Sequence, residues 1–246
     1  MKSTFFVFAS FFALHGVVAD PIKIALTFDD GFDHHLTLIA PMLEKYGYRG
    51  AFNIVTDNMG RIEDRLTWDE VRKLKKRGHD IFSHSRTHVN LARLYEDGLV
   101  DKVLSEIIGS SAAISREIGE SPKVFCFPFN AGEGVYDMVR AAGMVPMQVT
   151  RVNFGDGTWT NGNADIGAHI KALYASGAKA DALMIHGVGK KTGAWRPFVD
   201  AAHFEQFLKD LKGLEKSGTI KVVPYMEISE IVAPDSPIPV KVIFDI

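Results

Sequence analysis

The sequence predicts an α/β protein in which parallel strands curl into a (β/α) barrel. Three observations support this fold class. Short apolar segments of strand character alternate with longer segments of helical spacing, as in βα units that build a parallel sheet. The length of 246 residues suits a single α/β barrel domain. Polar residues also follow several of the expected strands, and the carboxyl ends of barrel strands are where sites are built.

The expected strands are short apolar runs bounded by turn residues. They occupy residues 22–28, 50–55, 80–83, 124–127, 144–150, 182–185 and 220–224. The expected helices carry apolar residues at helical spacing and end near glycine. They span residues 36–46, 67–77, 97–118 and 201–216. Thr67 is expected as the N-cap of the second helix, because Glu70 three residues later completes a capping box.

The chain is expected to comprise three parts. Residues 1–19 have the features of a signal peptide: Lys2 near the start, an apolar stretch, and small residues before Asp20. The stretch is short for a membrane span, which needs about 20 apolar residues. Residues 20–233 are expected to form one domain, and residues 234–246 a tail with a short final strand. The protein is therefore expected to be secreted or periplasmic.

The composition argues for a neutral or weakly charged substrate. The formal net charge is −2, and no block rich in Lys and Arg stands out. A nucleic acid or an anionic lipid surface is therefore not expected as a partner.

Cys126 is the only cysteine, so the chain cannot form an internal disulfide. We expect Cys126 to be a buried apolar residue rather than a reactive thiol.

The first chemical motif is Thr27-Phe28-Asp29-Asp30-Gly31, directly after the first expected strand. Two adjacent carboxylates repel each other, so the pair suits a bound cation. One carboxylate can then bind the metal while the other accepts a proton. The alternative is a solvated turn, because Asp-Asp-Gly is also good turn composition.

The second motif is His84-Ser85-Arg86-Thr87-His88, directly after another expected strand. Two histidines four residues apart lie on one face of a helical turn, within reach of a shared ion. In a chain with nine histidines this spacing alone is weak evidence. Together with the Asp pair, it supplies one carboxylate and two imidazoles and leaves positions open. That set is typical of a catalytic metal site rather than a structural one.

Together the two motifs resemble the signature of the polysaccharide deacetylase family, also called the NodB-homology domain or carbohydrate esterase family 4. The resemblance covers nearly all of residues 24–231. It implies a distorted, TIM-like (β/α) barrel with about seven parallel strands. It also implies a hydrolase that removes acetyl groups from a carbohydrate. The substrates implied are O-acetylated xylan-type sugars and N-acetylated chitin-type or peptidoglycan-type sugars.

The resemblance implies roles for individual residues. Asp29 matches the general base. Asp30, His84 and His88 match the ligands of a divalent metal ion, with Zn²⁺ expected first and Co²⁺ or Ni²⁺ as alternatives. His186 matches the catalytic acid, which follows a late strand.

Four further residues are expected to contact the substrate. Phe129 matches an aromatic residue whose main-chain N–H helps to hold the oxyanion, and Trp159 matches an aromatic wall of the acetyl pocket. Met184 stands two residues before the acid histidine, where Leu is usual. Trp195 lies in a Gly-rich loop, where an aromatic ring either stacks on a sugar ring or packs within the loop.

The sequence departs from the family pattern around the base and the acid. Cys126 stands where the family usually has an Arg that orients the base. Thr158 stands where an Asp usually precedes the pocket Trp and tunes the acid His186. Other carboxylates remain open as partners of that histidine. They are Asp156, Asp165 and Asp181.

These departures keep open a carbohydrate-binding protein without turnover. The resemblance also keeps open a hydrolase of small cyclic amides, because relatives of this fold hydrolyse such substrates. An amide leaving group needs protonation more than an ester does, so altered surroundings of His186 favour an O-acetyl ester as substrate. His34 and His35, which follow the Asp pair, are expected at the surface, with a place along the substrate groove as the alternative.

Overall fold

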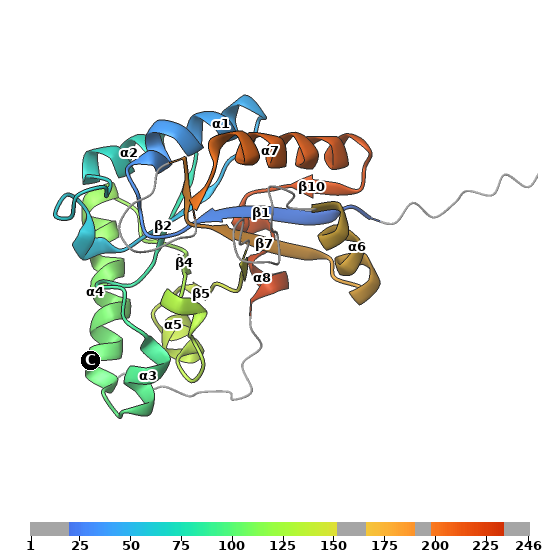
Figure 1. Cartoon of the computed structure of the whole chain (residues 1–246). Coiled ribbons are helices and arrows are strands. Elements are labelled where there is room, and N and C mark those ends of the chain that lie inside the picture. Colours follow the sequence, from blue (N-terminus) through green and yellow to red (C-terminus); the bar gives the residue numbers. More distant parts are fainter. Residues whose placement is uncertain (1–19, 152–165, 190–197, 234–246) are drawn as a thin grey trace, which may run out of the picture.

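The computed structural model describes residues 20–151, 166–189 and 198–233, and its centre is a curled sheet in which the strands pair in parallel (Figure 1). The strand order is β5-β4-β3-β2-β1-β7-β6, and β10 pairs with β1. The strands are β1 (Ile22–Phe28), β2 (Ala51–Ile54), β3 (Asp80–Ser83), β4 (Val124–Phe125), β5 (Val145–Pro146), β6 (Thr150–Arg151), β7 (Ala180–Ile185) and β10 (Ile220–Val222). The predicted parallel α/β fold is confirmed, and over the described residues the barrel stays open between β5 and β6.

Strand β1 is the central element of the sheet. It pairs with β7 from Lys23 to Phe28. Its other edge is shared by two strands, because β10 pairs with Ile22–Ile24 and β2 pairs with Thr27–Phe28. Its apolar residues are buried almost throughout, as expected for a parallel strand that is covered on both faces. The sheet therefore fixes the position of the two aspartates that follow β1.

The helices cover the sheet from the outside, and the connections include several shorter helical turns. The helices are α1 (Ala40–Lys45), α2 (Trp68–Lys76), α3 (Leu91–Glu96), α4 (Val100–Ile118), α5 (Tyr136–Ala141), α6 (Ile166–Ser176), α7 (Ala201–Lys216) and α8 (Ser229–Val232). The shorter turns are a π-helical turn η1 (His35–Ile39) and the 3₁₀ turns η2 (Thr56–Asn58), η3 (Pro128–Asn130) and η4 (Tyr225–Glu227). In Figure 1, α1, α2 and α7 lie together on one side of the sheet.

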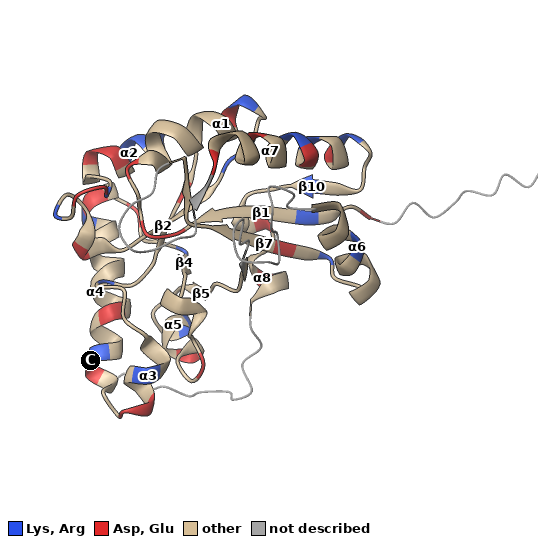
Figure 2. Ribbon diagram, viewed as in Figure 1, with Lys and Arg blue, Asp and Glu red and all other residues tan. Residues whose placement is uncertain are grey.

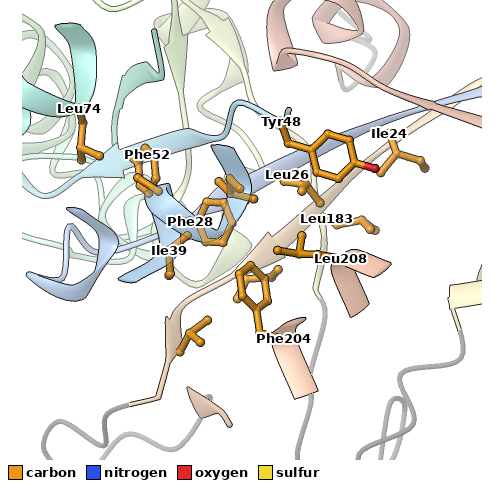
Figure 3. Packing of buried hydrophobic residues seen from close by; sticks show 14 of the residues in the cluster. Ile24, Leu26, Phe28, Ile39, Tyr48, Phe52, Leu74, Leu183, Phe204 and Leu208 are labelled. Atoms are coloured by element: carbon orange, nitrogen blue, oxygen red, sulfur yellow. The ribbon is translucent and has the colours of Figure 1, made fainter. Parts of the chain in front are cut away.

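Aromatic packing holds the end of β1 against these helices (Figure 3). The Phe28 ring stacks on Phe52 of β2 with 5.2 Å between ring centroids. It also meets the ring of Phe204 of α7 edge-on at 6.1 Å. All three side chains are fully buried. Large aromatic pairs contribute strongly to core stability, so the strand end that leads into Asp29 and Asp30 is rigidly supported.

The outer helices are amphipathic. On α7 the buried face carries Phe204, Phe207, Leu208 and Leu211, while basic and acidic residues alternate on its outer face (Figure 2). The same mixture of charge signs is visible on α2 (Figure 2). None of the helices in the described ranges has the length and apolar character needed to cross a membrane.

Several expected elements differ from those observed. The helix expected over residues 97–118 is α4, which begins at Val100, after Gly98 in a left-handed conformation, and ends at Ile118 as expected. The strand expected over residues 144–150 is divided into the short strands β5 and β6. Helices α3, α5, α6 and α8 were not expected, and a small parallel pair, β8 (Gly187–Val188) with β9 (Phe198–Val199), is also new. The tail with its expected final strand lies outside the described residues.

The predicted capping box of α2 is confirmed. Thr67 Oγ1 accepts a hydrogen bond from the main-chain N–H of Glu70, and Glu70 Oε2 accepts one from the main-chain N–H of Thr67 at 2.8 Å. Each contact satisfies an amide that the first helical turn would otherwise leave without a partner.

We expect Thr67→Ala to destabilise the fold by about 1 kcal/mol, because it removes one side of the box. In a domain of this size the melting temperature should fall by about 2–4 °C. Thermal unfolding followed by circular dichroism measures this change. Thr67→Ser keeps the hydroxyl and serves as the control. A melting temperature that is equal in Thr67→Ala and wild type would show that the cap contributes nothing.

Candidate active site

Polar residues from three strands meet at the carboxyl edge of the sheet. Asp29 and Asp30 follow β1, His84 follows β3, and His186 follows β7. Because these strands are parallel, their carboxyl ends share one edge. The second expected histidine, His88, reaches the same point from the loop after β3.

Asp30, His84 and His88 point their polar atoms at one another. One potential ligand atom from each lies within 4.8 Å of the other two. Asp30 Oδ1 is 3.2 Å from His88 Nε2 and 3.5 Å from His84 Nε2. Of the residues that we expected to bind a metal, the structure therefore brings all three together.

These three residues fit a divalent metal ion. Asp30 Oδ1 is buried and makes no hydrogen bond, although two ring nitrogens are close to it. A buried carboxylate oxygen without such a partner is costly, and a cation between the three atoms would satisfy it. One carboxylate and two imidazoles suit zinc-like metals and leave coordination positions open.

The charge state of Asp30 agrees with a ligand role. Burial raises the pKa of the Asp30 carboxyl, but the neighbouring imidazoles of His84 and His88 outweigh this effect. The pKa of Asp30 therefore lies well below its ordinary value, and the group is an anion at neutral pH.

A main-chain carbonyl orients His84. Its Nδ1 lies 3.0 Å from the carbonyl oxygen of Cys126. A carbonyl only accepts hydrogen bonds, so Nδ1 carries the proton in the neutral ring, and Nε2 presents its lone pair toward Asp30. Histidines that bind a metal through one ring nitrogen usually donate a hydrogen bond from the other nitrogen in this way.

The segment between the two histidines is a loop, so the predicted helical turn is wrong. Ser85 and His88 both have left-handed backbone conformations, with φ of 64° and 62°. Ser85 Oγ accepts a hydrogen bond from the main-chain N–H of His88 at 2.9 Å. This tight loop, rather than the spacing of a helix, brings the ring centroids of His84 and His88 to 5.0 Å.

Left-handed residues cluster around the site. In the described part of the chain, most of the non-glycine residues with positive φ belong to the three loops that form it. They are Asp30, Ser85, His88, Phe129 and Asn130. Such conformations cost about 1–3 kcal/mol each and persist only where the surroundings determine them, which is common at functional sites.

Two neutral donors hold Asp29. The Asn53 amide donates a hydrogen bond to Asp29 Oδ1 at 2.6 Å. The Cys126 thiol donates to both carboxylate oxygens at 3.7 Å. Burial raises the pKa of that thiol to about 12, so it remains a neutral donor. Cys126 is thus buried as predicted, and it contacts the carboxylate at the position where the family usually has an Arg.

Asn53 was missed by the sequence analysis. It is a polar residue in the middle of the fully buried strand β2, which lies beside β1. A buried amide in a strand is expensive unless it has a partner, so its presence in Ala51–Ile54 was a usable signal.

His186 and its neighbour His35 occupy the β7 side of the site. His186 is close enough to lower the pKa of Asp30. His35 is fully buried, and its Nε2 lies 2.7 Å from the main-chain oxygen of His186. The prediction that His34 and His35 lie at the surface is wrong, because both are buried. His35 instead ties η1 to the strand end that carries His186.

The residues expected at the substrate are distributed unevenly. Phe129 is 57% exposed, and its ring centroid is 4.8 Å from that of His88. Met184 is buried within β7 and pairs in register with Thr27. Trp159 and Trp195 lie outside the described residues, as do Asp156 and Asp165.

Asp181 has partners elsewhere. Its carboxylate lies 2.7 Å from His169 Nε2 and accepts a hydrogen bond from Thr150 Oγ1 at 2.9 Å. It stands near the start of β7, whereas His186 follows the end of that strand. Asp181 therefore joins α6 to the sheet, and its contacts there do not support it as the carboxylate partner expected for His186.

Comparison with known proteins identifies the relatives of this chain. The polysaccharide deacetylase family profile matches residues 17–146, more than half of the chain. The chain is 33% identical over 91 residues to a chitin deacetylase of Arthroderma benhamiae, which covers 35% of this chain and 24% of that protein. It is 29% identical over 108 residues to a peptidoglycan-N-acetylglucosamine deacetylase of Bacillus cereus, which covers 44% of this chain and 36% of that protein.

The fold has matching solved structures. A chitin deacetylase from Colletotrichum lindemuthianum superposes with a TM-score of 0.58 at 21% identity, covering 89% of this chain and 90% of that one. At this identity the likeness concerns the fold. The profile match over more than half of the sequence carries the further conclusion that this chain belongs to the polysaccharide deacetylase family.

Proposed function

We propose that the protein is a metal-dependent hydrolase that removes acetyl groups from a polysaccharide. The observation that carries this proposal is the convergence of Asp30, His84 and His88, with Asp29 held beside them. Membership of the deacetylase family supports it. The curated relatives are named as chitin and peptidoglycan deacetylases, but the matches span only 24% and 36% of their lengths, so their substrates are candidates for this chain.

The ligand set would hold a divalent ion, Zn²⁺ first. Such an ion lowers the pKa of a bound water toward neutrality and polarises the acetyl carbonyl. In the proposed reaction Asp29 accepts the proton of the attacking water. Asn53 and Cys126 keep its carboxylate in one orientation, so little reorganisation accompanies proton transfer.

Residues on the other sides of the site would complete the reaction. His186 protonates the departing sugar oxygen or nitrogen. The main-chain N–H of Phe129 donates to the oxygen of the acetyl group as negative charge develops on it. The exposed Phe129 ring offers a face on which a sugar can stack. We assign the acetyl-pocket and stacking roles to Trp159 and Trp195, with Met184 behind the pocket.

We also propose the arrangement of the whole chain. Residues 1–19 would act as a signal peptide, residues 20–233 as the deacetylase domain and residues 234–246 as a tail. The apolar segment at the N-terminus supports this arrangement and a secreted or periplasmic location.

The proposed function is tested by measuring acetate release from acetylated xylan and from chitooligosaccharide, with and without a chelator. We expect release that stops on chelation and returns with Zn²⁺. Release from xylan alone would identify an O-acetyl esterase, and release of free amine from the chitooligosaccharide an N-deacetylase. A folded, zinc-loaded protein that acts on neither would contradict the proposal. Binding of the sugar without turnover would then indicate a carbohydrate-binding protein, and hydrolysis of a small cyclic amide would indicate a cyclic-amide hydrolase.

We expect Asp30→Asn to weaken Zn²⁺ binding by about 100-fold or more, because loss of a charged ligand should exceed the effect of losing an outer partner. Isothermal titration of the metal-free protein measures this change. Asp69→Asn removes an exposed carboxylate of α2 that pairs with Arg72 and is the matched control. Equal zinc affinity in Asp30→Asn and wild type would rule out Asp30 as a ligand.

We expect Asn53→Leu to lower kcat by about 10- to 100-fold with little change in KM. The variant removes a hydrogen bond to a charged group, which is worth about 1.5–3 kcal/mol. Zinc affinity should stay unchanged, because Asn53 does not contact the ligand atoms. Asp29→Asn should lose activity and also keep zinc. If Asn53→Leu retained full kcat, Asn53 would have no part in orienting the base.

A further inference from the structure

Glu106 contacts the loop between the two histidines through its carboxylate. It lies on the buried face of α4 and is 8% exposed. Its Oε2 accepts hydrogen bonds from the main-chain N–H groups of Arg86 and Thr87 at 2.9 and 2.8 Å. Its Oε1 accepts one from Thr87 Oγ1 at 2.7 Å. One carboxylate therefore makes three hydrogen bonds to consecutive residues of the loop.

The surroundings of Glu106 form a close contact between α4 and this loop. A Cβ atom at Gly109 would come within 3.0 Å of Arg86 Cδ, so the helix approaches the loop closely. One residue further on, Ser110 Oγ lies 2.6 Å from Ser83 Oγ at the end of β3. The helix thus contacts the segment from Ser83 to Thr87, which leads from His84 toward His88.

A second element, η2, also holds the loop. The main-chain N–H groups of Thr56 and Asp57 in η2 donate to the carbonyl oxygens of Ser85 and Arg86. The amides of Arg86 and Thr87 donate to Glu106, so η2 holds loop carbonyls and α4 holds loop amides. Because Ser85 has a left-handed backbone, the loop cannot close the hydrogen bonds of a helix and depends on such external partners.

We propose that Glu106 is a positioning residue that fixes the spacing of His84 and His88 and thereby sets the affinity of the site for its metal ion. This inference rests on the proposed metal-dependent function. Glu106 does not contact the ligand atoms, and it acts through the loop backbone. The Glu106 carboxylate accepts hydrogen bonds from three donors of the loop. We therefore expect the position of its oxygens, rather than its negative charge, to hold the loop in place.

The test compares Zn²⁺ dissociation constants by competition with a chromogenic chelator, using the full domain. Glu106→Ala should weaken binding by about 10- to 100-fold, the usual effect of losing an outer partner. Glu106→Gln should restore most of the affinity. The glutamine oxygen can accept from both amides, and its NH₂ group can donate to Thr87 Oγ1.

Glu117→Ala is the matched control. Glu117 lies on the same helix and pairs with Arg72 and Arg116, away from the loop. This variant should bind zinc like wild type. A second readout is the zinc concentration that restores activity to the metal-free protein, which should rise for Glu106→Ala and not for Glu117→Ala.

A folded Glu106→Ala protein with wild-type zinc affinity would overturn the inference. If that variant does not fold, Glu106→Asp decides the question, because it keeps the charge but shortens the side chain by one methylene and so withdraws the carboxylate from the two loop amides. Weaker zinc binding by Glu106→Asp would support the inference, and unchanged affinity would overturn it. Wild-type protein that binds no zinc would contradict the proposed function itself, whereas equal binding by wild type and Glu106→Ala removes only the role of Glu106.

Discussion

Asp29 and Asp30 are adjacent carboxylates that are both buried, and anions in this position destabilise a fold unless donors or cations face them. Much of the site consists of groups that stabilise these two carboxylates. Asn53 and Cys126 donate to Asp29, while His84 and His88 face Asp30. The two carboxylates thereby acquire different surroundings, which is what the roles proposed for them, base for Asp29 and metal ligand for Asp30, require.

The fold holds the site residues in place both at the strand ends and in the loops that follow them. Phe28 and its aromatic neighbours hold the end of β1, and η2 and α4 hold the loop after β3. The left-handed residues lie in the segments that follow the strands, where chain direction changes sharply. Precision at the site thus comes from a rigid sheet combined with loops that are tied by specific hydrogen bonds.

Much of this architecture could be predicted from sequence. Local patterns were sufficient for β1, for the capping box at Thr67 and Glu70, and for α7 (Ala201–Lys216). The pairing of an Asp-Asp motif with two histidines, each motif after an expected strand, was sufficient to predict that one carboxylate meets His84 and His88, and the resemblance to the deacetylase family identified that carboxylate as Asp30. These features depend on residues close in sequence or on the general rule that parallel strands share an edge.

The features that could not be predicted depend on contacts between residues that are far apart in the sequence. The spacing of His84 and His88 suggested a helical turn, but tertiary hydrogen bonds stabilise a left-handed loop instead. His35 looked like a surface residue because its partner, the carbonyl of His186, lies 151 positions away. Asn53 and Glu106 are polar residues among mainly apolar neighbours on a buried strand and a buried helix face. The sequence shows that such residues need hydrogen-bond partners, but only the fold identifies those partners.

The sharing of β1 between three strands has a consequence for how the chain acquires its structure. β1 ends at Phe28, whereas β7 begins at Ala180 and β10 at Ile220. The partners that complete the edges of β1 are thus synthesised long after β1 itself. Contacts so distant in sequence slow folding, because a long loop must close before they form. During synthesis the edges of the strand that leads into Asp29 and Asp30 remain incomplete until the segment that ends at Val222 has emerged, so the two aspartates gain their full support late in the folding of the nascent chain.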